Sequence, residues 1–284
     1  MNIGILLFEK WHGKKFLGSS RIRGHWLVKH WDELELFEQG KKYDAVIFQK
    51  TYWLKYVESY DGIKILDVCD PDWLDGQAEM RNIINHCDAV TTSTEALRDT
   101  IKGFAGDKPV VYIPDRQDLE FHNKQKVHKG RAKKIIWFGY SHNASVLDIA
   151  LGFLKSKDLQ LTVLSEARPP YPNADRNIKY DWGNPEFDFN GILLQHDIVL
   201  LPEDTRPRGK YKSKNKTYTA WALGLPVAST PEDVERFMEA EERRKEAKLR
   251  LKEIREKYDV KQSVEDFKQL IKQIDESRRK NNTN

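Results

Sequence analysis

Short apolar runs rich in β-branched residues recur along the first part of the chain, separated by segments with helical spacing. The runs, which are typical of strands buried on both faces, are 3–8, 45–48, 64–68, 89–92 and 110–113. The helical segments between them include 20–31, 77–87 and 94–104. This alternation predicts a parallel sheet that is covered by helices on both faces.

A second alternation of the same kind follows a polar stretch at residues 116–134. Its expected strands are 135–138, 160–164, 198–201 and 226–229, and the pattern is helical from residue 231 onward. We therefore predict an α/β protein with two Rossmann-like domains that face each other across a cleft. The expected parts are an N-terminal domain (1–115), a linker (116–134), a C-terminal domain (135–258) and a closing helix with a tail (259–284).

Composition and charge narrow the class of protein only in part. Hydrophobic residues make up 39% of the chain and charged residues 32%, as in soluble globular proteins. The formal net charge of +4 is compatible with anionic substrates, nucleic acid or a membrane surface. The chain has no apolar run long enough for a membrane span, and its start lacks the features of a signal peptide. Cys69 and Cys87 show no metal-binding or redox spacing, so we expect reduced thiols in a cytoplasmic protein.

The most informative segment, residues 197–229, joins a predicted strand to a basic loop and a helix start. The basic loop (residues 206–216) has no acidic residue and carries Arg206, Arg208, Lys210, Lys212, Lys214 and Lys216. A helix start favours anions through its unpaired N–H groups and its dipole. A solvated surface or a nucleic-acid patch would also explain the charges. The position between a strand end and a helix start favours a phosphate site.

Polar side chains also follow the first predicted strand. Ser19, Ser20, Arg21 and Arg23 come after Gly18, which permits a tight loop. We expect these four side chains to contact an acceptor or a diphosphate. The alternative is a capped surface helix with Ser20 as its N-cap.

Three carboxylates lie at the end of the predicted strand 64–68. They are Asp67, Asp70 and Asp72, at a position where catalytic residues of parallel sheets commonly lie. Asp70 is our candidate general base for an acceptor hydroxyl. The alternatives are a divalent-ion site formed by the spaced carboxylates, or a turn in which Asp70 precedes Pro71.

Residues 216–227, KTYTAWALGLPV, resemble the donor-binding segment of GT-B glycosyltransferases, especially those related to family 4. Other segments are similar to the family in the same order: AVTTSTEALRD (89–99), VVYIPD (110–115), DIVLLP (197–202) and EKYDVKQSVEDFKQLI (256–271). The resemblance implies a GT-B fold whose last helices return to the N-terminal domain. It also implies transfer of a sugar from a nucleotide-diphosphate sugar without a metal ion.

Single residues carry over from the family only in part. Lys216 matches the family lysine that contacts the donor phosphates, whereas Thr219 stands where a glutamate commonly holds the donor ribose. The first glutamate of the family's paired-glutamate motif would fall near Tyr211 and is missing from this chain. The resemblance therefore implies phosphate recognition more directly than ribose recognition. The expected donor site also includes Arg206, Arg208, Lys212, Lys214, Gly139, Ser141, His142 and Asn143.

The expected function is that of a glycosyltransferase, of the hexosyltransferase type, acting on an unidentified hydroxyl acceptor. The acceptor classes are a glycan, a lipid-linked compound or a nucleic acid. No cofactor or metal is expected, because the nucleotide-diphosphate sugar is a co-substrate and cationic side chains stabilise its leaving group. Two alternatives stay open: a glycosyltransferase that acts on modified bases in DNA, and a non-catalytic GT-B-like binding protein.

Overall fold

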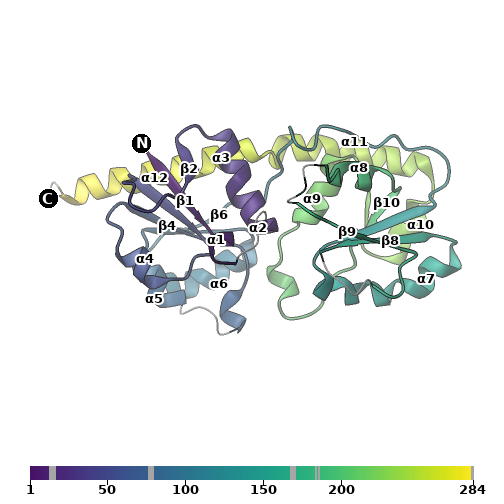
Figure 1. Ribbon diagram of the computed structural model, residues 1–284, viewed down its shortest axis with the longest axis horizontal. Coiled ribbons are helices and arrows are strands. Elements are labelled where there is room, and N and C mark those ends of the chain that lie inside the picture. Colours follow the sequence, from purple (N-terminus) through teal and green to yellow (C-terminus); the bar gives the residue numbers. More distant parts are fainter. Residues whose placement is uncertain (13–16, 76–79, 167–170, 183, 185, 283–284) are drawn as a thin grey trace. The chain divides into compact units, whose positions relative to one another are not determined.

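The computed structural model describes residues 1–12, 17–75, 80–166, 171–182, 184 and 186–282. The chain forms two compact units, each with its own parallel sheet (Figure 1). The first unit contains Met1–Asp118, Arg206–Ser213 and Val260–Asn284. The second contains Leu119–Thr205 and Lys214–Asp259. Both sheets that the apolar runs predict are therefore present.

The sheet of the first unit has six parallel strands in the order β2-β1-β3-β4-β5-β6. Their bounds are β1 (Ile3–Leu7), β2 (Leu34–Leu36), β3 (Ala45–Gln49), β4 (Ile63–Val68), β5 (Ala89–Thr92) and β6 (Val110–Tyr112). Successive residues of the central strands enter two different cores, as Ile47 and Phe48 do. Both faces are apolar because helices cover both faces of this sheet.

The helices of the first unit come from both ends of the chain. Those before the second unit are α1 (Glu9–His12), α2 (Gly18–Ser20), a π-helical turn (Arg21–His25), α3 (Trp26–His30), α4 (Leu54–Glu58), a 3₁₀ turn (Asp72–Asp75), α5 (Met80–Asn85) and α6 (Glu95–Ala105). The last is α12 (Val260–Asn282), which packs against α3 (Figure 1). Phe267 of α12 and Leu27 of α3 share one buried core, so α12 completes the first unit.

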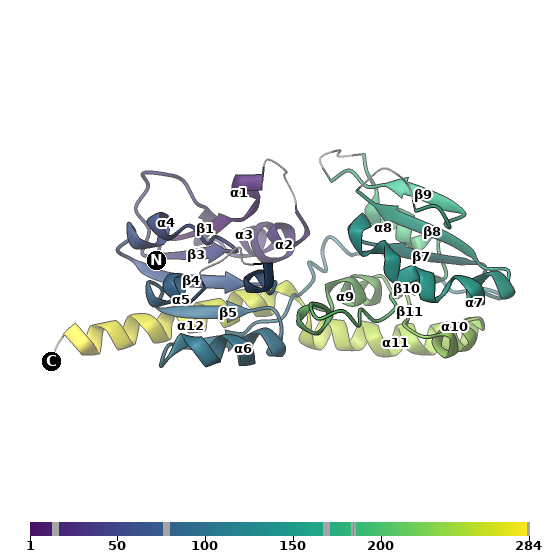
Figure 2. The same cartoon turned by 90° about the horizontal axis from the view of Figure 1, so that it is seen from below.

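The sheet of the second unit has five parallel strands in the order β11-β10-β7-β8-β9. Their bounds are β7 (Lys134–Phe138), β8 (Gln160–Ser165), β9 (Arg176–Lys179), β10 (Ile198–Leu200) and β11 (Val227–Ala228). The helices are a 3₁₀ helix (Ser141–Ile149), α7 (Leu151–Ser156), α8 (Phe189–Leu194), α9 (Asn215–Ala222), α10 (Pro231–Arg236) and α11 (Ala240–Lys257). Helix α9 packs along α11 (Figure 2).

The structure differs from the predicted pattern in four places. Strands β2 and β9 were not predicted, because each is a short edge strand with polar residues and no continuous apolar run. The polar stretch 116–134 is packed rather than exposed throughout, since Gln117, His122 and His128 are buried. Helix α12 extends to Asn282 and takes up most of the expected tail. Among the described residues, no helix combines the length and the apolar character that a membrane crossing requires.

Candidate functional site

The strand order of the second unit marks one place where a ligand is expected. Strand β7 is the first strand of this sheet along the chain and lies between β8 and β10. The strands β8 and β9 are added on one side of β7, and β10 and β11 on the other. Ligands of open parallel sheets bind at such a switch point, outside the carboxyl ends of the strands. Gly139 directly follows β7, and Lys216 lies in the first turn of α9, after β10. Gly139 and Lys216, two residues of the predicted donor site, therefore belong to this edge of the sheet.

Lys216 lies against the turn at Gly139. A Cβ atom added to Gly139 would lie 3.2 Å from Lys216 Nζ and 3.1 Å from the Trp137 ring. The ammonium group of Lys216 lies over that ring, 5.1 Å from its centroid. Any larger residue at position 139 would thus push into the lysine or the indole. The glycine keeps the turn open beside a fixed positive charge, as phosphate recognition requires.

The residues after Gly139 form a second group of polar side chains. The backbone N–H of Ser141 donates to Glu166 Oε2 at 3.0 Å, and the Ser141 hydroxyl donates to Glu166 Oε1 at 3.1 Å. Asn143 Nδ2 and His142 Nε2 lie 3.0 Å apart. Ser141, His142 and Asn143 therefore lie at the carboxyl edge of the sheet, and their contact with the donor stays a prediction. The Glu166 carboxylate, which the sequence did not single out, takes the Ser141 donors.

Thr219 stands at the sequence position of the family's ribose-binding glutamate, but its side chain is turned back onto its own helix. Its side chain is buried, and its hydroxyl donates to the Asn215 carbonyl oxygen at 2.9 Å, one turn back in α9. Such a bond satisfies a hydroxyl within its own helix. The expectation that Thr219 binds the donor directly finds no support in this geometry.

The basic loop divides between the two units. The structure groups Arg206–Ser213 with the first unit, whereas Lys214 and Lys216 belong to the second. A 3₁₀ turn at Gly209–Tyr211 interrupts the loop, so it is not one extended segment. Arg206, Arg208 and Lys212 thus group with the first unit, and their contact with the donor phosphates stays a prediction.

Tyr211 anchors this part of the loop in the first unit. Its ring is buried and meets Trp73 edge-on, with the ring centroids 5.4 Å apart. Its carbonyl oxygen accepts a hydrogen bond from the Thr94 hydroxyl at 3.3 Å. Beside it, Arg208 Nη2 lies 4.0 Å from Asp72 Oδ1. The loop thus brings a cation to the aspartate cluster of the first unit.

Arg23 was predicted to contact an acceptor, but the structure gives it a structural role. Its side chain is 3% exposed. Nε and Nη2 donate to the two carboxylate oxygens of Asp67 at 2.7 and 2.6 Å, and Nη1 donates to Asp115 at 3.0 Å. Burial by itself lowers the pKa of Arg23, but the Asp67 charge outweighs this effect and the pKa lies above its ordinary value. The guanidinium therefore serves the fold rather than a ligand.

The other residues of this loop differ in exposure. Ser20 is buried, and its hydroxyl donates to Gln49 Oε1 at 3.2 Å rather than capping a helix. Ser19 is partly exposed. The guanidinium of Arg21 lies over the Trp26 ring, 5.6 Å from its centroid. Ser19 and Arg21 therefore remain the acceptor-side residues of the predicted set.

Asp70, the predicted general base, lies just beyond β4 and is 37% exposed. Lys50 Nζ, from the end of β3, donates to Asp70 Oδ2 at 2.7 Å and lies 3.5 Å from Asp72 Oδ2. The Tyr52 hydroxyl donates to Asp72 Oδ2 at 2.7 Å. Asp70 is thus the exposed member of a cluster in which Asp72 and Lys50 are mostly buried.

Burial and charge in this cluster shift the pKa values of Lys50, Asp72 and Tyr52. Burial by itself lowers the pKa of Lys50, but the attraction of Cys69, Asp70 and Asp72 holds it above its ordinary value. Burial raises the pKa of Asp72 and, more strongly, that of Tyr52. Lys50 is therefore a permanent cation beside Asp70.

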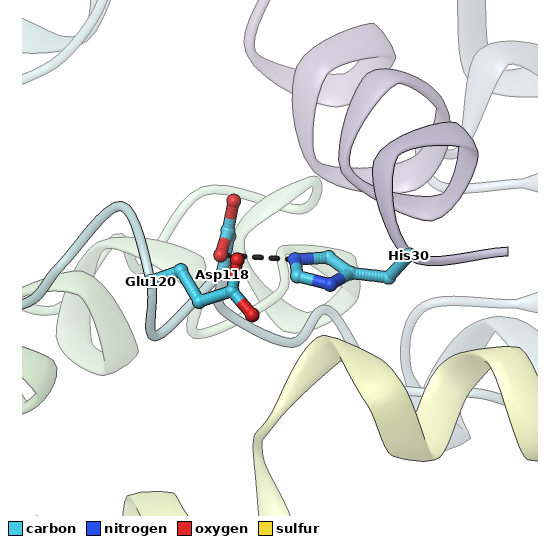
Figure 3. Close-up of side chains that lie close together, drawn as sticks. All are labelled: His30, Asp118 and Glu120. Atoms are coloured by element: carbon cyan, nitrogen blue, oxygen red, sulfur yellow. Dashed lines mark hydrogen bonds and ion pairs between the residues drawn. The ribbon is translucent and has the colours of Figure 1, made fainter.

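A separate histidine–carboxylate pair lies at the end of α3. His30 Nε2 lies 3.0 Å from Asp118 Oδ1 (Figure 3), and Lys29 Nζ donates to Asp118 Oδ2 at 2.7 Å. Asp118 is buried, and the Lys29 ammonium compensates its charge. Glu120, which Figure 3 also shows, belongs to the second unit. We assign this group no ligand.

The residues that the sequence did not single out share one signal. Glu166 and Lys50 each directly follow a strand, β8 and β3, at the carboxyl edge of a parallel sheet. The same rule that selected Asp70 would have selected both. Trp137 lacked such a signal, because an aromatic residue inside an apolar strand is usually core. Only the contact with Lys216 shows its position beside the turn.

Comparisons with known proteins were made at three levels. No protein-family model matches the sequence, and no curated protein matches it. Among solved structures, an alpha-glucosyltransferase in complex with UDP and a 13-mer DNA containing a HMU base matches with a TM-score of 0.68 and 11% identity, over 96% of this chain and 99% of that one. The DNA modifying enzyme beta-glucosyltransferase matches with a TM-score of 0.62 and 13% identity, over 95% and 99%.

TarM matches with a TM-score of 0.60 and 12% identity, over 80% of this chain and 54% of that one. The chain spans about half the length of TarM and 58% of the matched chain in the GtfA/B complex. At these identities the matches concern the fold. The chain therefore has the fold of these glucosyltransferases, built from two parallel sheets.

Proposed function

We propose that the protein is a glycosyltransferase that moves a sugar from a nucleotide-diphosphate sugar to a hydroxyl acceptor. The observation that carries the proposal is the Lys216 ammonium held against the Gly139 turn at the switch point of the second sheet. The fold shared with glucosyltransferases along 96% of the chain supports the same function. The GT-B resemblance of residues 216–227 agrees with it.

In this proposal the donor diphosphate binds at the Gly139 turn. Lys216, Lys214 and the first N–H groups of α9 face negative charge that grows on the diphosphate as the glycosidic bond breaks. Fixed cations at that point lower the barrier, because they stabilise the transition state more than the intact donor. The reaction therefore needs no metal ion for this step.

Asp70 is the proposed general base. Its carboxylate can take the proton of the acceptor hydroxyl as the new bond forms, and Lys50 Nζ holds Oδ2 in place at 2.7 Å. Its partial exposure leaves room for an acceptor, unlike Asp67 and Asp72.

DNA is one candidate acceptor for the proposed sugar transfer. One matched glucosyltransferase was solved in complex with UDP-glucose and DNA containing an abasic site. For this chain a DNA acceptor would use the basic loop. Its affinity for duplex DNA would then fall steeply as salt concentration rises, because bound phosphates release counterions. Salt-independent or absent DNA binding would exclude that acceptor.

A thermal-shift screen tests the donor. A ligand that binds only the folded state raises the melting temperature by mass action. UDP-, GDP-, ADP-, TDP- and CMP-linked sugars are screened with the wild-type protein, with Lys216→Ala and with Lys252→Ala, whose lysine is exposed on α11. We expect at least one donor to shift the wild type and the Lys252→Ala control but not Lys216→Ala. A donor that binds without any turnover would favour the non-catalytic alternative.

A further inference from the structure

Glu166 is a carboxylate held in a defined position at the carboxyl edge of the second sheet. It directly follows β8, and its two oxygens face the Ser141 N–H and hydroxyl at 3.0 and 3.1 Å. The Tyr180 hydroxyl, which follows β9, lies 3.4 Å from Oε2. Three donors from two other strand ends thus fix its orientation. The proposed transfer chemistry assigns Glu166 no role.

The position of Glu166 relates directly to the proposed phosphate site. Strand β8 is hydrogen-bonded to β7, so the two strand ends are neighbours at a spacing of about 4.8 Å. Gly139 and Lys216 lie at the end of β7, and Glu166 lies at the end of β8. In parallel sheets with this strand order, phosphates lie at the turn after the first strand. An acidic residue after the second strand then hydrogen-bonds the ribose of the same nucleotide.

The hydrogen bonds of Glu166 leave capacity for such a ligand. A carboxylate offers about four lone-pair sites. Oε1 accepts from the Ser141 hydroxyl, and Oε2 accepts from the Ser141 N–H with a long contact to Tyr180. The side chain is partly exposed. A ribose offers two neighbouring hydroxyl donors, and bonds from them to an ionised carboxylate are of the stronger, charge-assisted kind.

We propose that Glu166 binds the 2′- and 3′-hydroxyls of the donor's ribose and makes the protein selective for ribonucleotides. This inference rests on the proposed function, because the ribose is that of the nucleotide-sugar donor. It also accounts for Thr219, whose hydroxyl is turned back into α9 and leaves the ribose without a partner there. In this proposal the ribose-binding carboxylate comes from the end of β8 rather than from helix α9.

Glu166 has one competing role. Its carboxylate accepts from the Ser141 N–H, at the start of the helix that follows the Gly139 turn, where a phosphate oxygen could bind instead. In that case Glu166 would repel the diphosphate, and its removal would tighten nucleotide binding. The two roles therefore predict opposite effects of the same substitution.

Binding of UDP, GDP and ADP and of their 2′-deoxy forms separates these roles. Calorimetric titrations use the wild type, Glu166→Gln, Lys216→Ala and Glu232→Gln, a control at an exposed glutamate of α10. We expect the wild type and the control to bind one ribonucleotide at least about tenfold more tightly than its deoxy form. Glu166→Gln should lose most of this ratio by weakening the ribonucleotide alone. Lys216→Ala should weaken both forms and keep the ratio.

Each other result overturns a defined part of the account. If a nucleotide binds through Lys216 but the wild type does not distinguish ribose from deoxyribose, the role of Glu166 is wrong and the proposed function stands. The same conclusion follows if Glu166→Gln binds the ribonucleotide unchanged or more tightly. If none of the six nucleotides binds the folded wild type, the proposed function and the role of Glu166 fall together.

Discussion

Arg23 and Asp67 form a buried, bidentate ion pair beneath the carboxyl edge of the first sheet. Asp67 is fully buried and also accepts a hydrogen bond from the Thr91 hydroxyl at 2.7 Å. The guanidinium reaches Asp115 and the Ile113 carbonyl oxygen as well. These contacts join β4, β5 and the segment after β6, so the pair holds the edge of the sheet that carries Asp70.

The Arg23→Ala substitution should therefore destabilise the protein strongly. It leaves the Asp67 carboxylate buried without its counter-charge, which costs about 3–5 kcal/mol in other proteins. The free energy of unfolding in urea measures the effect. The exposed ion pair of Arg279 with Asp275 provides a control, because Arg279→Ala should cost about 1 kcal/mol or less. Equal costs for the two variants would contradict the structural role of Arg23.

His128 should make the stability depend on pH. Its Nε2 donates to the Gly224 carbonyl oxygen at 2.8 Å, and its Nδ1 accepts from Arg243 Nε at 3.3 Å, so the ring is neutral. Burial, opposed in part by the Gly224 bond, lowers its pKa below the ordinary value of 6.5. The unfolded chain thus binds this proton more tightly. Stability is complete above the unfolded pKa and falls as the pH drops below it.

Urea unfolding at pH 7.5 and pH 5.5 tests this dependence. We expect the wild type to lose up to about 1.4 kcal/mol of stability through this group, because pH 5.5 lies one unit below the ordinary pKa of 6.5. His128→Asn should lose less, because it removes the group that gains a proton. His196, whose pKa is also lowered by burial, remains in that variant and leaves a residual dependence. An identical dependence in wild type and variant would exclude His128 as a source.

At the scale of elements, the sequence predicted the strands that form the centre of each sheet. Strands such as β3 and β7 are continuous apolar runs, so their identity follows from local composition. The edge strands β2 and β9 were missed, because pairing with one neighbour lets polar side chains remain. The 3₁₀ helix at 141–149 begins soon after the Gly139 turn, and this start places Ser141 beside Glu166.

Helix α10 depends on a capping box. The Thr230 hydroxyl accepts from the Asp233 N–H at 3.2 Å, and the Asp233 carboxylate accepts from the Thr230 N–H at 3.3 Å. Thr230→Ala should lower the free energy of unfolding by about 1 kcal/mol. Thr230→Ser keeps the oxygen and should change it much less. A similar loss in both variants would show that the methyl group matters rather than the cap.

At the scale of the whole molecule, the two units are interleaved along the chain. The first unit takes residues from three separate stretches, including α12 at the end. Local sequence patterns do not show that a C-terminal helix packs in the N-terminal unit. Only the family resemblance implied that the last helices return to it. The same holds for the basic loop, whose alternating charges gave no sign that it divides between the units. Gly139 and Lys216 could be selected from the sequence, because one directly follows a predicted strand and the other lies at a predicted helix start; phosphate binding by them stays a prediction.

A fragment of residues 1–118 should fail to fold by itself. It lacks α12, whose Val264, Phe267 and Leu270 share the core with Ile47 and Leu27. Without that helix, one apolar face of the sheet is exposed to water. Circular dichroism during urea titration should show no cooperative transition for the fragment, whereas the full chain should show one. A cooperative transition in the fragment would mean that α12 is dispensable for the first unit.

The most direct test of the account is the rate at which nucleoside diphosphate is released from nucleotide sugars. The wild type, Lys216→Ala and Lys252→Ala are each incubated with UDP-, GDP-, ADP- and TDP-linked sugars, with CMP-linked sugar tested for release of CMP. We predict release from at least one donor by the wild type and the control. Lys216→Ala should lower kcat/KM by about a hundredfold or more, because a preorganised charge at the leaving group is lost. Absence of release from every donor by the folded wild type, or an unchanged rate in Lys216→Ala, would contradict the account.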